Sequence, residues 1–242
     1  PGIEVLPQIG IAALYLTDYS MAIWRSPAEL GHTWSLSVEE HFYLVWPLFL
    51  LTTRSLTDRR LAQMLAIGFV LATAWRMIDG LTWNNWFWSY YRFDTRMSGL
   101  MIGSLLAVIP WRPGATAASS IGLYSLGILI LALVLFRIGT MASLIWGGLI
   151  ADIASAGLIL SLTTAHLTPL ARALSHPVLR YIGMISYSIY LWHYPLARAL
   201  RDDLNPLVAL AIVLAFAISA AAICYQLLEK PLKIYRHREA PV

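Results

Sequence analysis

The sequence predicts an all-α fold, a polytopic membrane helix bundle with about eight transmembrane helices. Of the 242 residues, 59% are hydrophobic and only 12% are charged, and the mean hydropathy is +0.66. This composition is far more apolar than that of an ordinary soluble domain. Apolar runs long enough to span a bilayer recur along the chain, and no strand-like alternation competes with them.

The expected spans, most of them about 17 to 25 residues long, follow one another from end to end. They lie near residues 6–24, 36–53, 61–79, 95–110, 118–137, 140–163, 181–201 and 206–228. The fourth is short, and the seventh carries Tyr, Ser and His through its middle. We expect a single membrane-embedded domain over residues 1–242, N-terminally incomplete and without a soluble domain.

The distribution of Lys and Arg between the expected spans indicates the orientation of the chain. Ten of the 17 basic residues fall in one set of loops and the C-terminal tail, and seven fall elsewhere. Because positive charge accumulates on the cytoplasmic side, this bias predicts a cytoplasmic C-terminus. The aromatic segment 83–91 then lies on the outer side, either as an interfacial belt or as the lining of a cleft.

Composition also excludes several classes of function. Cys224 is the only cysteine, so an internal disulfide and a cysteine metal site are both impossible. No spacing of histidines and acids suggests a metal site. The net charge of +4 comes mostly from residues that flank apolar runs, so we expect no nucleic-acid binding.

Two adjacent carboxylates lie at the start of the second expected span, in the segment 32–47. An ionised carboxylate in a membrane segment costs on the order of 3 kcal/mol, so it usually faces a cavity or a partner. On a helix, Glu39, Tyr43 and Trp46 share one face, while Glu40 points elsewhere. A carboxylate that only stabilises the helix N-terminus is the alternative.

A second candidate segment carries two arginines at the outer end of the fourth expected span. Arg92 and Arg96 are predicted to share a helical stripe with Gly99 and Gly103, small residues against which another helix can pack. A guanidinium can fork to a carboxylate or phosphate, so we interpret Arg96 as a charge clamp that could meet Glu39. A pair of interfacial, snorkelling arginines is the alternative.

The third candidate segment lies in the seventh expected span. Ser186, Tyr190 and His193 share one helical face. A polar face inside a span must meet a cavity or other helices. A histidine that only forms a structural hydrogen bond is the alternative to a chemical role for His193.

Together these segments resemble the acyltransferase-3 family of bacterial integral-membrane O-acyltransferases. Residues 32–47 are similar to its H-T-W-S-L-S-V-E-E-Q-F-Y-L-x-W-P signature, residues 95–107 to its T-R-x-D-G-L-L-x-G-x-x-L-A segment, and residues 186–195 to its S-Y-S-I-Y-L-W-H-x-P segment. The three occur in the family's order. This chain has His41 in place of the family's Gln, and Ser98 in place of the Asp of the second segment.

The resemblance implies transfer of an acyl group, usually acetyl, from acyl-CoA to a hydroxyl of a cell-surface carbohydrate or lipid-linked acceptor. It implies a multi-pass protein of the bacterial cytoplasmic membrane, with acyl-CoA as substrate and no bound cofactor. The reaction needs a base for the hydroxyl proton and donors for the oxyanion. The family's proposed catalytic histidine lies on a first helix that this chain does not contain, so we expect a C-terminal portion of such an enzyme.

The candidate site residues come from the three segments. The expected catalytic residues are Glu39 as base or orienter of a base, Arg96 as clamp, and His193 as a polar group lining the cavity. The expected substrate-binding residues are His32, Trp34, Glu40, Tyr43, Arg92 and Tyr190. Two alternatives remain: a truncated membrane protein without catalysis, and a transporter whose intramembrane charges bind a substrate.

Overall fold

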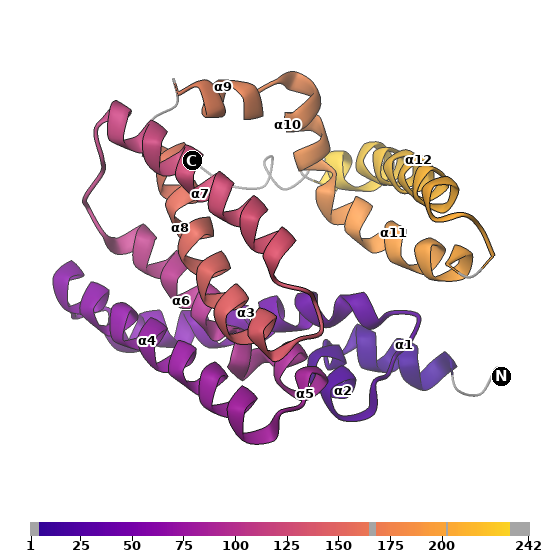
Figure 1. The fold of residues 1–242 in the computed structure, drawn as a ribbon, viewed down its shortest axis with the longest axis horizontal. Helices are drawn as coiled ribbons and strands as arrows, with labels where there is room; N and C mark the ends of the chain where they lie inside the picture. The colour runs from indigo at the N-terminus through magenta and orange to yellow at the C-terminus, as the bar shows by residue number, and fades with distance from the viewer. Residues whose placement is uncertain (1–4, 165–167, 202, 233–242) are drawn as a thin grey trace. The chain divides into compact units, whose positions relative to one another are not determined.

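The computed structural model describes residues 5–164, 168–201 and 203–232 (Figure 1). Within these ranges every regular element is a helix, which confirms the predicted all-α class. The chain divides into two compact units, Pro1–Ala173 and Leu174–Val242. Each unit is described by itself below.

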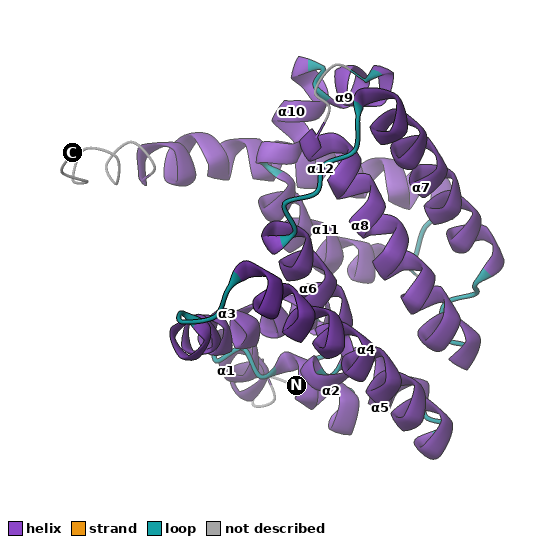
Figure 2. Ribbon diagram, turned by 90° about the vertical axis from the view of Figure 1, so that its left-hand side faces the viewer, coloured by secondary structure: helices purple, strands orange, loops and turns teal. Residues whose placement is uncertain are grey.

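The helices alternate with short loops throughout (Figure 2). The first unit contains α1 (Val5–Ala13), α2 (Thr17–Trp24), the 3-10 turn η1 (Gly31–Thr33), α3 (Trp34–Thr53), α4 (Asp58–Trp83), α5 (Trp86–Tyr91), α6 (Phe93–Val108), α7 (Ala115–Leu135), the π-helical turn η2 (Ser143–Gly147) and α8 (Gly148–Thr164). α9 (Pro169–Leu174) ends at the boundary between the units. The second unit contains α10 (Pro177–Met184), α11 (Ser186–Leu200), α12 (Pro206–Cys224) and the π-helical turn η3 (Tyr225–Glu229).

Several of these helices are long and apolar enough to cross a membrane. Among the described residues they are Asp58–Trp83, Ala115–Leu135, Ser143–Thr164 and Pro206–Leu232. These four coincide with the third, fifth, sixth and eighth expected spans. Because such stretches match the thickness and polarity of a bilayer core, the chain is a membrane protein.

Polar side chains set the ends of α4 and α5. The Thr57 hydroxyl accepts a hydrogen bond from the Arg60 N–H and caps the start of α4. Asn84 ends α4 with a φ of 44°, a left-handed conformation that asparagine adopts more readily than most residues. Asn85 then caps α5 by accepting a hydrogen bond from the Trp88 N–H at 3.2 Å. The two asparagines therefore set the end of α4 and the start of α5, and α5 packs against α4.

Two stretches that hydropathy predicts as continuous spans are each two helices, so that prediction is wrong for both. Residues 6–24 divide into α1 and α2 near Tyr15, whose φ is 54°. At the start of α2 the Thr17 N–H donates to Ser37 Oγ at 3.2 Å, and this contact with α3 replaces a bond within a continuous helix. Residues 181–201 begin inside α10 and continue in α11.

α7 and α8 lie side by side and pack through small residues (Figure 1). The Ser161 hydroxyl on α8 donates to the Ala118 carbonyl on α7 at 2.6 Å. A Cβ at Gly122 would collide with Ser161, and a Cβ at Gly157 would collide with Ser125. The glycines therefore permit the close approach that small residues give transmembrane helices.

Candidate active site

The acid pair lies in the first two turns of α3, where Glu39 and Tyr43 are exposed and Glu40 is half-buried. Glu39 and Tyr43 share a face as predicted. Trp46 lies further along the same face of this continuous helix, and its ring stacks on Phe42 with the ring centroids 4.9 Å apart. Within the described part of the chain, Glu39 forms no hydrogen bond or ion pair. The carboxylate of Glu39 therefore has no bonding partner among the described residues.

Arg96 on α6 is held against aromatic rings from α3 and α5. Its Nε donates to the Tyr90 carbonyl at 2.7 Å. Its guanidinium carbon lies 4.0 Å from the Tyr90 ring centroid and 5.1 Å from that of Trp34. The structure therefore brings Trp34 and Arg96 together, but none of the ion pairs among the described residues joins Arg96 to Glu39.

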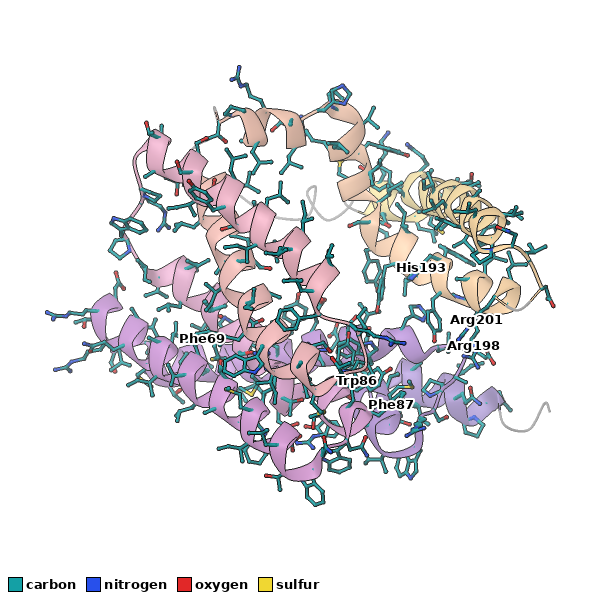
Figure 3. All side chains as sticks on the ribbon, in the orientation of Figure 1. Phe69, Trp86, Phe87, His193, Arg198 and Arg201 are labelled. Atoms are coloured by element: carbon teal, nitrogen blue, oxygen red, sulfur yellow. The ribbon has the colours of Figure 1, made fainter. Side chains whose placement is uncertain are left out.

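The aromatic segment that supports Arg96 is itself packed together, and two of its rings are labelled in Figure 3. Trp86 stacks on Tyr90 with centroids 4.1 Å apart. Phe87 stacks on Tyr91 at 5.9 Å and lies 4.3 Å beneath the guanidinium carbon of Arg25. Because each ring fixes its neighbour, the segment holds the Tyr90 carbonyl and ring in place against Arg96.

Arg92 lies outside α6, in the junction between α5 and α6, and its side chain binds one acid from α4 and one from α6. Its backbone is extended, with φ −67° and ψ 143°, at the N-cap of α6, so the prediction that it shares a helical stripe with Arg96 is wrong. Arg92 Nη1 lies 3.1 Å from Asp79 Oδ1, and its Nε donates to Asp94 Oδ1 at 3.0 Å. Trp75 Nε1 donates to the same carboxylate at 2.7 Å. These buried contacts draw the arginine away from the helix surface.

The ion pair shifts the pKa of both partners. Burial raises the pKa of Asp94, but the hydrogen bonds from Arg92 and Trp75, with the Arg92 charge, outweigh it and hold that pKa below its ordinary value. Burial lowers the pKa of Arg92, while the hydrogen bond and charge of Asp94 and the charge of Asp79 raise it above its ordinary value. Both groups stay ionised at neutral pH, so a substrate would have to displace an existing partner to reach Arg92.

A buried charge cluster joins α4, α6 and α8, and sequence reasoning missed two of its three members. Arg76 is 1% exposed, and its Nη1 lies 3.1 Å from Asp152 Oδ2. The Ser98 hydroxyl donates to the same carboxylate oxygen at 2.7 Å and accepts from Arg76 Nη1 at 2.9 Å. Ser98 stands where the resembled family segment has Asp, so Asp152 supplies from another helix the carboxylate that the segment lacks.

A second missed pair joins α2 to α3. Asp18 is fully buried, and its Oδ2 lies 3.2 Å from His41 Nδ1. The His41 ring also makes an edge contact with Phe93, with centroids 5.6 Å apart. Asp18 is an acid inside an apolar run, which is the signal that could have found it. The predicted site residue His32 is buried nearby in η1, which packs against α2 and α3.

The remaining site candidates lie in the second unit. Ser186, Tyr190 and His193 line one pocket of about 530 Å³ between α11 and α12, which confirms their shared face. His193 Nδ1 lies 2.6 Å from the Tyr190 carbonyl oxygen. Since a carbonyl only accepts, Nδ1 carries the hydrogen and Nε2 is the basic nitrogen of the neutral ring. These residues form a group of their own within the second unit.

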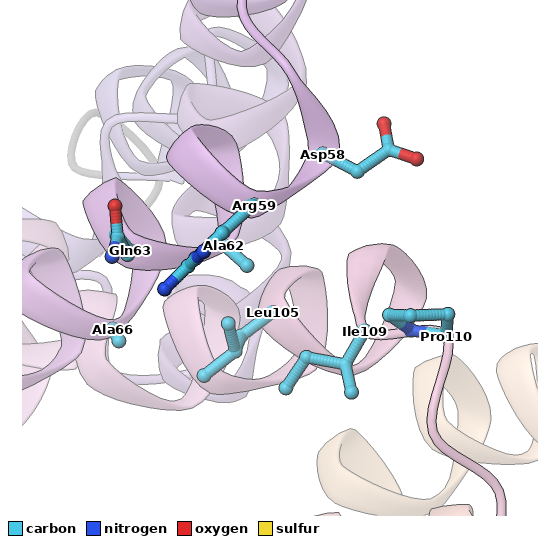
Figure 4. Close-up of a pocket in the computed structure, with 8 residues that line it drawn as sticks. All are labelled: Asp58, Arg59, Ala62, Gln63, Ala66, Leu105, Ile109 and Pro110. Carbon is cyan, nitrogen blue, oxygen red and sulfur yellow. The ribbon is translucent and has the colours of Figure 1, made fainter.

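A larger pocket, of about 670 Å³, lies where the start of α4 meets the end of α6 (Figure 4). The residues that line it are Asp58, Arg59, Ala62, Gln63, Ala66, Leu105, Ile109 and Pro110. Arg59 extends over the apolar floor, whereas the Asp58 carboxylate points away from it. This pocket therefore offers one cationic group beside an apolar surface, at the ends of α4 and α6 opposite to Arg96.

Comparison with known proteins assigns the family. Residues 8–228 match the family described as "Acyltransferase domain". The chain is 31% identical over 221 residues to the peptidoglycan O-acetyltransferase OatA of Listeria monocytogenes, covering 86% of this chain and 36% of that protein. It is 29% identical over 224 residues to "Putative peptidoglycan O-acetyltransferase YrhL" of Bacillus subtilis, covering 86% and 35%.

The chain thus spans about a third of the length of the curated relatives it matches. No solved structure matches it. The family match includes all three motif segments, which lie within residues 8–228. The resemblance to the acyltransferase-3 family is therefore confirmed, and the chain belongs to this family of acyltransferases.

Proposed function

We propose that the chain is the membrane domain of an O-acyltransferase that moves an acyl group, acetyl in the simplest case, from acyl-CoA to a hydroxyl of a cell-surface carbohydrate. The observation that carries the proposal is the family match, which extends over 8–228 and contains Glu39 and Arg96. Two relatives named as peptidoglycan O-acetyltransferases support acetyl as the group and a cell-wall glycan as the acceptor.

The proposal includes a multi-pass topology in the bacterial cytoplasmic membrane, with the C-terminus in the cytoplasm. In that orientation the start of α4 and the end of α6 face the cytoplasm. The Arg59 pocket then lies on the side of the donor, and its guanidinium complements the phosphates of acyl-CoA. The pantetheine arm of the donor would extend from there and carry the thioester toward Arg96. Arg96 lies toward the opposite side, where the acceptor is found.

The chemistry assigns distinct tasks to the candidate residues. The acceptor oxygen attacks the thioester carbonyl as its proton passes to a base; the carbon–sulfur bond then breaks, and the thiolate takes up the proton. Glu39, exposed and without an ion pair or hydrogen bond to another described residue, is proposed as that base or as the orienter of a histidine base. Arg96, whose Nε is fixed by the Tyr90 carbonyl, is proposed to stabilise the oxyanion.

The remaining candidates are proposed to hold the acceptor. Trp34 lies beside Arg96, where an aromatic face can pack on a sugar ring. The other proposed contacts in the first unit are His32, Glu40 and Tyr43. Tyr190 and His193 are proposed to bind substrate within the second unit, at the pocket that they line. Arg92 is the weakest of the set because two carboxylates already neutralise it.

The experiment that tests the proposal follows labelled acetyl groups through a membrane. Sealed vesicles containing the complete gene product receive acetyl-labelled acetyl-CoA on the cytoplasmic side and glycan fragments on the other. We expect an alkali-labile acetyl ester on the glycan. Label that reaches only water as free acetate, or an equal ester yield from vesicles without the protein, would refute acyl transfer by this chain.

A further inference from the structure

The Arg96 side chain opens into a pocket of about 410 Å³, and Arg96 is the one lining residue to which the acyl-transfer proposal gives a role. The residues that line it are Tyr90, Arg96, Leu129, Ala132, Leu133, Phe136, Ser143, Gly147, Gly148 and Ala151. They come from α5, α6, α7, η2 and α8, all within the first unit. The volume lies within the range of small-molecule sites, so the pocket can hold a ligand.

The charges at one end of this pocket favour an anion. Arg96 uses Nε for the Tyr90 carbonyl, and its terminal nitrogens form no hydrogen bond with any other described residue. Among the described residues, the side chains that act on the charge of Arg96 include Tyr90, Arg76 and Asp152. Two cations face one carboxylate, so this end of the pocket carries an excess positive charge in a low-dielectric region.

Arg76 lies directly behind the wall of the pocket. A Cβ built on Gly148, which lines the pocket, would meet Arg76 Cζ at 3.0 Å and Nη2 at 3.3 Å. Arg76 is 1% exposed, and its Nε and Nη2 have no hydrogen-bond partner within the described ranges. A buried donor without an acceptor destabilises the fold. Because Gly148 has no side chain, an anion in the pocket can approach these Arg76 nitrogens and offset that cost.

The other walls of the pocket suit a hydrocarbon chain. Leu129, Ala132, Leu133 and Phe136 form one side, in or beside a helix apolar enough to span a membrane. Leu133 is 78% exposed, so this side opens toward the bilayer. A ligand would enter from the lipid with its chain along α7.

We propose that this pocket binds an anionic amphiphile, with a carboxylate or phosphate head at Arg96 and a single apolar chain along α7. The head would accept hydrogen bonds from the terminal nitrogens of Arg96 and lie close to the unpaired side of Arg76. The chain would fill the apolar part of the pocket. The inference does not depend on acyl transfer, because its test measures binding.

The test uses the purified complete protein in phosphatidylcholine nanodiscs and a photoreactive dodecanoate as probe. Cross-links mapped by mass spectrometry are expected in the peptides of α7 and α8. Dodecanoate and dodecyl phosphate should each compete with the probe, and the stronger of the two identifies the natural head group. Dodecanol and inorganic phosphate should compete at least about tenfold less well, since each lacks one half of the ligand. If dodecanol or inorganic phosphate competed with the probe as strongly as dodecanoate does, the proposal would be overturned.

Matched variants separate this pocket from the rest of the lipid surface. Ala132→Trp fills the pocket and should lower labelling about tenfold, whereas Leu131→Trp, one position along α7 and outside the pocket, should not. Arg96→Gln should abolish the preference for dodecanoate over dodecanol. Labelling of Ala132→Trp at the wild-type level, or equal loss in Leu131→Trp, would refute the assignment. Size-exclusion profiles verify that each variant is folded.

Discussion

Glu39 on α3 and Asp152 on α8 are two acids in an apolar protein, and their surroundings are opposite. Glu39 is exposed and forms no ion pair with another described residue. Asp152 contacts the fully buried Arg76 at 3.1 Å and accepts a hydrogen bond from Ser98. Among the residues that the structure describes, the acid of the family motif has no ion-pair partner, while the acid of the apolar helix α8 neutralises a buried cation.

This difference separates a folding role from a chemical role. A buried ion pair is strongly coupled to folding, because removal of one partner leaves the other charge without compensation. An exposed acid without contacts contributes little to stability, and its lone pairs remain available to a substrate. The comparison therefore predicts that Asp152 variants fail in folding and Glu39 variants fail in catalysis.

The largest effect is expected for Asp152→Asn. The variant leaves Arg76 buried without its counter-ion, so the free energy of unfolding should fall by about 3–5 kcal/mol. Thermal unfolding in detergent, followed by fluorescence, measures the loss. The double variant Arg76→Met with Asp152→Leu should recover most of it. An Asp152→Asn protein as stable as wild type would show that Arg76 does not need this carboxylate.

The reverse pattern is expected for Glu39→Gln. The substitution keeps the volume of the side chain and removes its charge, so acyl transfer should fall by about 10²–10⁴-fold. Stability should change by no more than about 0.5 kcal/mol. Labelled ester on the glycan and the unfolding temperature are measured in the same preparation. Transfer at the wild-type rate would end the assignment of Glu39 to the reaction.

A smaller loss of activity is expected for Arg96→Lys. Lysine keeps the charge but reproduces neither the planar fork nor the Nε–H that donates to the Tyr90 carbonyl. Loss of one hydrogen bond by a charged group corresponds to roughly a ten- to hundredfold drop in transfer. Arg137→Lys serves as a control for the exchange itself, because Arg137 is exposed and belongs to neither the proposed donor site nor the proposed acceptor site. An unaffected Arg96→Lys enzyme would show that charge alone suffices at this position.

Sequence reasoning predicted the helical class and four of the spans because both follow from apolar run length, which is a local property. It also predicted the shared face of Ser186, Tyr190 and His193, since helical periodicity fixes that face. The break near Tyr15 was missed because a contact with α3 decides it.

The pairing of charges could not be predicted for the same reason. Arg76 and Asp152 are 76 residues apart in the chain, and they meet because α6 packs against both α4 and α8. Arg92 was predicted on the α6 stripe because a helical pattern extends through it; the buried carboxylate of Asp79 holds it at the N-cap instead. Periodicity identifies faces, but the partner that a charge finds depends on tertiary structure.

The smallest effect concerns Asp94, the partner of Arg92 that lies between the extremes of the comparison. Its pKa is held below the ordinary value of 3.8 by Arg92 and Trp75, so its contribution to stability is present above that value and is lost as the pH falls through the lower, folded-state pKa. The side chain is 31% exposed, so the contribution is about 1 kcal/mol or less. The unfolding temperature of Asp94→Asn should therefore lie below that of wild type at neutral pH and approach it under acidic conditions.

Asp203→Asn, which removes an exposed carboxylate from the second unit, should leave the pH profile unchanged. A constant gap between Asp94→Asn and wild type at every pH would mean that side-chain packing, and not ionisation, makes Asp94 stabilising.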